Sequence, residues 1–163
     1  MNLKTTLTSF IGTTVEWAEF CFYGYLVTQL SPLFFPMLSP DIAIIAGFGA
    51  FAASYLARPL GGIFFGHIGD KWGRKKAFAG SILLMSVATF GIGLLPVYDT
   101  IGILAPILLV LLRFFQGLAT GGEYPGASVF IIEHNRDKPY FAASWVATAA
   151  AVSGLDSGAA AAT

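Results

Sequence analysis

The chain has 163 residues, of which 56% are hydrophobic and 11% charged, and its nine basic and nine acidic residues balance to a net charge of zero. A soluble domain carries about a quarter charged residues, so this composition argues against a water-soluble domain and predicts a surface that faces lipid. The zero net charge argues against a nucleic-acid partner, and the single cysteine, Cys21, excludes an internal disulfide and a metal cluster.

Long apolar stretches divided by short polar links predict an all-α, polytopic membrane protein. The stretches cover about residues 10–35, 42–68, 77–95 and 101–132, and each is long enough to cross a hydrocarbon core, which takes about 20 helical residues. A fifth begins near Tyr140, but its small residues and Asp156 predict an incomplete crossing. The first stretch is no secretory signal, because it is too long and carries Glu16 and Glu19.

Lysine and arginine predict the orientation, because these residues are retained on the cytoplasmic side. They are absent from the links 31–41 and 96–100 and occur at Lys4, in the run GHIGDKWGRKK (residues 66–76), and at Arg136 and Lys138. We therefore expect a cytoplasmic N-terminus and a cytoplasmic turn at residues 66–76.

Two charges in this turn lie where the helix dipole disfavours them. Asp70 falls at the C-terminal end of the second predicted helix, and Arg74 falls near the N-terminus of the third. We expect groups outside the turn to stabilise both charges. Asp70 could be stabilised by capping the N-terminus of another helix, and Arg74 by an acid that faces it. Glu133, at the cytoplasmic end of the fourth helix, is such an acid.

Five motifs occur in order along the chain. The pattern G-x-x-x-D-[RK]-x-G-R-[RK] is filled by Gly66, Asp70, Lys71, Gly73, Arg74 and Lys75, and R-x-x-Q-G is filled by Arg113, Gln116 and Gly117. Both resemble signatures of the major facilitator superfamily of secondary transporters. The stretches EWAEFCFYG, RPLGG (58–62) and GGE (121–123) resemble more narrowly its metabolite:proton symporter branch, with proline/betaine, 2-oxoglutarate, citrate and shikimate carriers. The resemblance covers residues from about Gly12 to about Trp145.

The resemblance implies a carrier of the bacterial inner membrane with twelve helices in two halves, which moves a small metabolite or osmolyte with protons by alternating access. Its conformational latch would comprise Gly66, Asp70, Gly73, Arg74 and Glu133, and in the family the acid that matches Asp70 caps a helix of the second half. The chain departs from the family in having Glu19 where E-W-x-D-F has an aspartate. It also supplies only the first four to five helices, so we expect residues 1–163 to form a partial N-terminal half without the C-terminal half.

Small residues predict close helix contacts. On the second helix they recur every four positions, with Arg58 among them (Ala46, Ala50, Ser54, Gly62, Gly66), and the fourth helix has two such pairs (Gly117 with Gly121, Gly122 with Gly126). Such stripes let neighbouring helices approach closely. Ordinary packing explains them, and sliding of these faces during alternating access would add a function to that packing.

Five charged residues lie within the predicted spans: Glu16, Glu19, Arg58, Arg113 and Glu123. Each charge at the bilayer centre costs roughly 2.5 to 3.5 kcal/mol on insertion scales. Three acids against two arginines leave one negative charge, and one shared proton would neutralise it, since burial favours the neutral acid and arginine stays protonated. The three acids are therefore the proton-coupling candidates, while Arg113 and Glu16 also fit a purely structural ion pair.

The substrate-binding candidates are Arg58, Arg113 and Gln116. Arg58 lies near the middle of the second helix, and its planar guanidinium can bind a carboxylate with two hydrogen bonds. Arg113, Gln116 and Thr120 follow one another at helical spacing in a polar strip that we expect to face the bundle interior. Pro59 and Pro125 would bend their helices beside Arg58 and Glu123, which suits a lined cavity.

No pattern predicts an enzyme, a cofactor or a metal site. The glycine-rich segment 117–126 follows no strand, GDKWGRKK lacks the spacing of a phosphate-binding loop, and His67 and His134 lack metal-ligand spacing. Two functions stay open. One is proton-coupled symport of a proline/betaine-type or carboxylate substrate, and the other is a truncated, non-transporting remnant that persists as a membrane-embedded bundle. A second copy or the missing C-terminal half would be the partner that completes a site.

Overall fold

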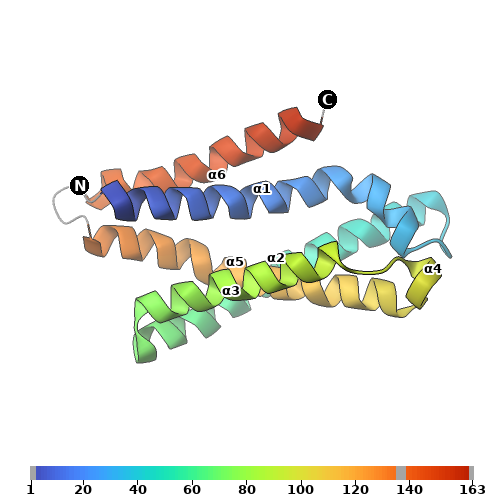
Figure 1. Ribbon diagram of the computed structural model, residues 1–163, viewed down its shortest axis with the longest axis horizontal. Helices are drawn as coiled ribbons and strands as arrows, with labels where there is room; N and C mark the ends of the chain where they lie inside the picture. Colours follow the sequence, from blue (N-terminus) through green and yellow to red (C-terminus); the bar gives the residue numbers. More distant parts are fainter. Residues whose placement is uncertain (1–2, 135–138, 162–163) are drawn as a thin grey trace.

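The computed structural model describes the backbone of residues 3–134 and 139–161 and most of their side chains. Its helices are α1 (Leu3–Phe34), α2 (Pro40–Trp72), α3 (Arg74–Gly93), α4 (Tyr98–Ile101), α5 (Leu104–His134) and α6 (Pro139–Ala161). These described residues include no strand, and the long helices form one elongated bundle (Figure 1). The predicted all-α fold is therefore confirmed.

Three helical segments within the described residues are long and apolar enough to cross a membrane. They are α2, α3 and the Leu104–Glu123 part of α5. This finding confirms the prediction of a polytopic membrane protein. Helix α1 begins before residue 10 and α2 continues beyond residue 68, because backbone hydrogen bonding continues where the apolar sequence stops.

The connections between helices depend on glycine at two positions. Gly73 alone separates α2 from α3 and has φ of +98°, and Gly102, with φ of +60°, separates the single-turn α4 from α5. Glycine has no Cβ, so this region of φ costs it little. The predicted stretch 101–132 is therefore interrupted near its start, and the long helix begins at Leu104.

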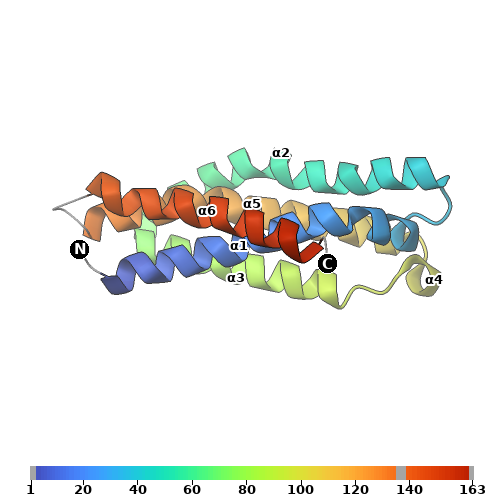
Figure 2. The ribbon, with the colours of Figure 1, turned by 90° about the horizontal axis from the view of Figure 1, so that it is seen from above.

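Helix α5 packs against α2, α3 and α6, while α1 packs mainly against α6 and α2. Figure 2 shows α2 and α3 on opposite sides of the bundle, and Figure 1 shows α6 beside α1, on the side away from α2 and α3. The N-terminus, the turn at Gly73, the end of α5 and the start of α6 lie at one end of the bundle (Figure 1). The link from α1 to α2 and the short α4 lie at the other end.

Glycines bring the backbones of α2 and α5 into direct contact. A Cβ added at Gly117 would overlap the carbonyl oxygen of Ser54, and one added at Gly121 would overlap that of Arg58. On α2, a Cβ added at Gly61 would overlap the carbonyl oxygen of Leu118 on α5. The predicted close approach of these two helices is therefore present.

The contact face of α2 differs from the predicted four-residue stripe. Its buried residues are separated by three or four positions: Ala43, Gly47, Ala50, Ser54, Ala57, Gly61, Phe65 and Gly69. With 3.6 residues per turn, a strict four-residue repeat drifts around the helix, so Arg58 and Gly62 still lie beside Gly121 but Gly66 has left the contact face. A Cβ added at Gly66 would meet no described atom within 4 Å.

Candidate functional site

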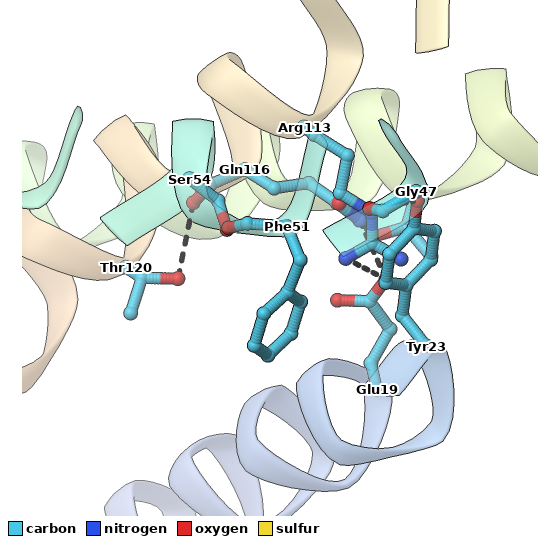
Figure 3. Close-up of polar contacts among 9 residues, drawn as sticks. Glu19, Tyr23, Gly47, Phe51, Ser54, Arg113, Gln116 and Thr120 are labelled. Carbon is cyan, nitrogen blue, oxygen red and sulfur yellow. Dashed lines mark hydrogen bonds and ion pairs between the residues drawn. The ribbon is translucent and has the colours of Figure 1, made fainter. Parts of the chain in front are cut away.

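Glu19 on α1 and the buried side chains of Arg113 and Gln116 on α5 form a polar cluster (Figure 3), and Thr89 extends it to α3. The side-chain amide of Gln116 on α5 donates one hydrogen bond to Glu19 Oε1 on α1, at 2.6 Å, and another to Thr89 Oγ1 on α3, at 2.9 Å. Arg113 Nη1 lies 3.9 Å from the same Glu19 oxygen. Arg113 and Gln116 are each only 2% exposed, so water contributes little to their solvation.

An aromatic ring completes the surroundings of Arg113. Its guanidinium carbon lies 3.5 Å from the centre of the Tyr23 ring, and the Tyr23 hydroxyl donates a hydrogen bond to the carbonyl oxygen of Gly47 at 3.3 Å. A cation over a ring face is attracted by the ring quadrupole. The sequence analysis missed Tyr23, although its position four residues after Glu19 places both side chains on one face of α1.

Glu19 and Glu123 line the same cavity of about 470 Å³, which lies between α1, α3 and α5. Its other walls are mainly apolar residues of α3 (Ile82, Met85, Phe90). Glu123 is 3% exposed, and a Cβ at Gly12 would lie 3.6 Å from its Oε1, so α1 packs closely on this acid. Among the described residues, Glu19 Oε2 has no hydrogen-bond partner.

Arg58 lies in different surroundings, next to the rings of Trp17, Phe20 and Tyr55. It lines a second cavity, of about 570 Å³, formed by residues of α1, α2 and α5 (Trp17, Tyr55, Arg58, Pro59, Gly62, Thr120, Gly121). The three predicted substrate-binding residues thus divide into two groups. Arg113 and Gln116 contact Glu19, whereas Arg58 faces a cavity on another side of α1.

Asp70 and Arg74 form an ion pair in the turn between α2 and α3. Arg74 Nη2 lies 2.9 Å from Asp70 Oδ1, and both side chains are largely exposed. Stabilisation of both charges by groups outside the turn stays a prediction. Within the turn, the pair brings the two charges together across the single residue, Gly73, that separates α2 from α3. The stem of Arg74 packs on Gly69, where a Cβ would lie 3.4 Å from Arg74 Cδ.

The remaining predicted site residues carry no structural assignment. The side chains of Glu16 and Glu133 lie outside the described residues, so the proposed contact of Glu133 with Arg74 does too. In the part of the chain that the structure describes, no group of three or more His, Cys, Asp or Glu side chains could hold a metal ion.

Comparison with known proteins gives two kinds of match. A family model described as "Sugar (and other) transporter" matches residues 4–138. Among curated proteins, the chain is 46% identical over 144 residues to the proline/betaine transporter of Escherichia coli (strain K12) and to the glycine betaine/proline/ectoine/pipecolic acid transporter OusA of Dickeya dadantii. It is 46% identical over 136 residues to a putative proline/betaine transporter of Staphylococcus aureus (strain COL).

These matches cover 88% of the chain for the first two relatives and 83% for the third. The chain spans 29% of the length of each relative. No solved structure matches the chain.

Proposed function

Because the chain belongs to the sugar (and other) transporter family of the major facilitator superfamily, we propose that it takes part in the transport of a small osmolyte of the proline or betaine type. Its 46% identity to proteins named as transporters of proline and betaine supports this substrate class. The relatives are named as transporters, so the chain belongs to a carrier family and not to an enzyme family. Transport would proceed across a bacterial cytoplasmic membrane by alternating access.

The observation that carries a proton-coupled mechanism is the arrangement of Glu19. One of its oxygens binds Gln116 and faces Arg113, the other has no partner among the described residues, and the residue lines a mainly apolar cavity. A proton on Oε2 would cancel the attraction between Glu19 and Arg113. Because these residues join α1 to α5, protonation would loosen the two helices relative to each other. Glu123, on the same cavity, and Glu16 are further candidates for the proton.

The substrate would bind near the middle of the membrane. Arg58, Trp17 and Thr120 all lie near the middle of their helices and line one cavity. Sites of secondary transporters lie near the bilayer midplane, between structural repeats. We place the substrate carboxylate on Arg58, while Arg113 and Gln116 become available to the substrate only when Glu19 is protonated.

The turn of Gly66, Asp70, Gly73 and Arg74, together with Glu133, would act as a latch on the cytoplasmic face, with the N-terminus on the same side. The exposure of the Asp70–Arg74 pair leaves both side chains accessible to a partner. That partner would be a C-terminal half of the carrier or a second copy of this chain.

Uptake into liposomes tests the proposal. The purified chain is reconstituted, and entry of labelled glycine betaine is followed with and without an imposed proton gradient. We expect gradient-driven uptake in the wild type and its fall to the level of protein-free liposomes in Glu19→Gln and in Arg58→Ala. Asp41→Asn, which changes an exposed acid at the start of α2, is the matched control and is expected to transport normally.

Exchange of labelled for unlabelled glycine betaine separates the two roles. The Glu19→Gln variant keeps a hydrogen-bond acceptor for Gln116, so it is expected to exchange substrate without responding to the gradient, whereas Arg58→Ala is expected to do neither. A gradient response in Glu19→Gln equal to that of the wild type would contradict the proton role. A folded, inserted wild type without uptake would favour the alternative, a bundle without transport activity.

A further inference from the structure

We propose that Trp17, Phe20 and Tyr55 form an aromatic cage for the ammonium group of a zwitterionic substrate, and that the guanidinium of Arg58 occupies this cage in the absence of substrate. The inference rests on the proposed function, because it names how the same cavity would recognise its substrate. None of the three rings belongs to the predicted site residues.

The three rings surround one point from three sides. The ring planes of Trp17 and Tyr55 make angles of 71° and 76° with that of Phe20, at centroid distances of 6.2 and 5.0 Å. The guanidinium carbon of Arg58 lies 4.4 Å from the centres of both Phe20 and Tyr55 and 5.5 Å from that of Trp17. All three distances are within the roughly 6 Å at which a ring face attracts a cation.

The cage has a fixed inner wall and an open side. Phe20 is 7% exposed, and Phe51 supports it from behind with a centroid distance of 4.5 Å and an angle of 31° between the rings. Tyr55 is 46% exposed and lines the cavity of about 570 Å³ together with Trp17 and Arg58. A solute in the cavity therefore reaches Trp17, Tyr55 and the guanidinium of Arg58, while Phe20 lies behind the guanidinium and becomes accessible when Arg58 moves.

A zwitterion can replace the guanidinium without leaving a charge unpaired. Its carboxylate binds the planar guanidinium with two hydrogen bonds, and the five N–H donors of arginine allow Arg58 to keep other partners at the same time. The carboxylate draws the guanidinium towards the cavity, and the substrate's ammonium group takes its place over the rings. Quaternary ammonium groups suit such cages well, because ring faces attract them and no hydrogen-bond acceptor is needed.

This exchange requires both charges on one molecule. Choline supplies the quaternary ammonium group but no carboxylate, so it must compete with Arg58 for the rings. Acetate supplies the carboxylate but nothing that refills the cage. We therefore expect glycine betaine to bind at least about tenfold more tightly than either, since each half of the exchange contributes an interaction of cation–π or ion-pair size.

Tryptophan fluorescence tests the cage. The chain has three tryptophans, and changing Trp72 and Trp145 to phenylalanine leaves Trp17 as the only emitter. Titration of this protein in detergent with glycine betaine, choline and acetate is expected to give a saturable change in emission with glycine betaine at the lowest concentration. Choline binding as tightly as glycine betaine, or no response to glycine betaine, would overturn the cage.

Two substitutions at Tyr55 provide a matched pair. Tyr55→Leu removes the ring face, and we expect it to raise the dissociation constant for glycine betaine about tenfold. Tyr55→Phe keeps the ring and is expected to leave the affinity close to that of the parent. An affinity of Tyr55→Leu for glycine betaine equal to that of the parent would overturn the proposal. If Tyr55→Leu fails to fold, the titration of the parent with glycine betaine, choline and acetate still tests the cage.

The binding and uptake measurements test the cage and the transport proposal separately. If glycine betaine binds with the expected dependence on Tyr55 but does not enter liposomes, the transport proposal fails and the cage stands. If Tyr55→Leu takes up glycine betaine with the half-saturation of the wild type, the cage fails and the transport proposal stands.

Discussion

Gln116 is the side chain through which α1, α3 and α5 meet. Its amide nitrogen has two hydrogens, and each is donated to a different helix, to Glu19 and to Thr89. A hydrogen bond to a carboxylate is stronger than one between neutral groups, and it is stronger still where little water competes. Gln116 therefore fixes the position of Glu19 in addition to any contact it makes with substrate.

Replacing Gln116 with leucine tests this role. Gln116→Leu keeps a side chain of similar size but leaves Glu19 Oε1 and Thr89 Oγ1 without the amide donor. The expected loss of stability is about 1 to 3 kcal/mol, the usual cost of leaving a buried polar group unsatisfied. Thermal unfolding in detergent, followed by circular dichroism, measures it. Gln29→Leu, at an exposed position of α1, is the control, and equal unfolding temperatures for the two variants would contradict the prediction.

The polar residues of the candidate site could be predicted from the sequence, but their partners could not. Charges within apolar stretches are conspicuous because their burial is costly, so Glu19, Arg58 and Arg113 could be predicted. Spacing along α5 showed that Arg113 and Gln116 share a face, but it could not show that this face meets Glu19. The rings beside the two arginines gave no signal either, because aromatic residues make up 15% of the chain.

The contact between α2 and α5 depends on positions where two backbones touch. Glycines at 61, 117 and 121 leave no room for a Cβ against the opposite helix. The predicted repeat of four on α2 was close to the observed face but drifted from it, because the face follows 3.6 residues per turn. The spacing of small residues thus predicts that two helices approach closely, and the structure shows which glycines are in contact.

Alanine at Gly117 tests the closeness of this contact. The added methyl group would overlap the backbone of Ser54, so α2 must shift, and overpacking of this kind typically costs about 1 to 3 kcal/mol. Gly49→Ala is the control on α2, where a Cβ would meet no described atom within 4 Å, and it is expected to gain about 0.5 to 1 kcal/mol from the better helix former. Gly117→Ala unfolding at or above the wild-type temperature would contradict the close contact.

At the scale of the whole molecule, the fold places the basic turn between α2 and α3 at one end of the bundle. The turn that carries Lys71, Arg74, Lys75 and Lys76 lies at the same end as the N-terminus (Figure 1). The opposite end holds the link from α1 to α2, the first turn of α2 with Asp41, and the short α4 with Asp99, and none of these segments contains lysine or arginine. Positive charges are retained in the cytoplasm, so this division predicts the sidedness of the bundle.

Cysteine labelling in cells tests that sidedness. In a Cys21→Ser background, Lys75→Cys places a thiol in the basic turn and Asp99→Cys places one on α4, and both native side chains are exposed. A membrane-impermeant maleimide is expected to label Asp99→Cys in intact cells and Lys75→Cys only after permeabilisation. Labelling of Lys75→Cys from outside would reverse the orientation and remove the turn from the face on which a cytoplasmic latch must act. Labelling of both from outside would show that α3 does not cross the bilayer, because positions 75 and 99 lie at its two ends.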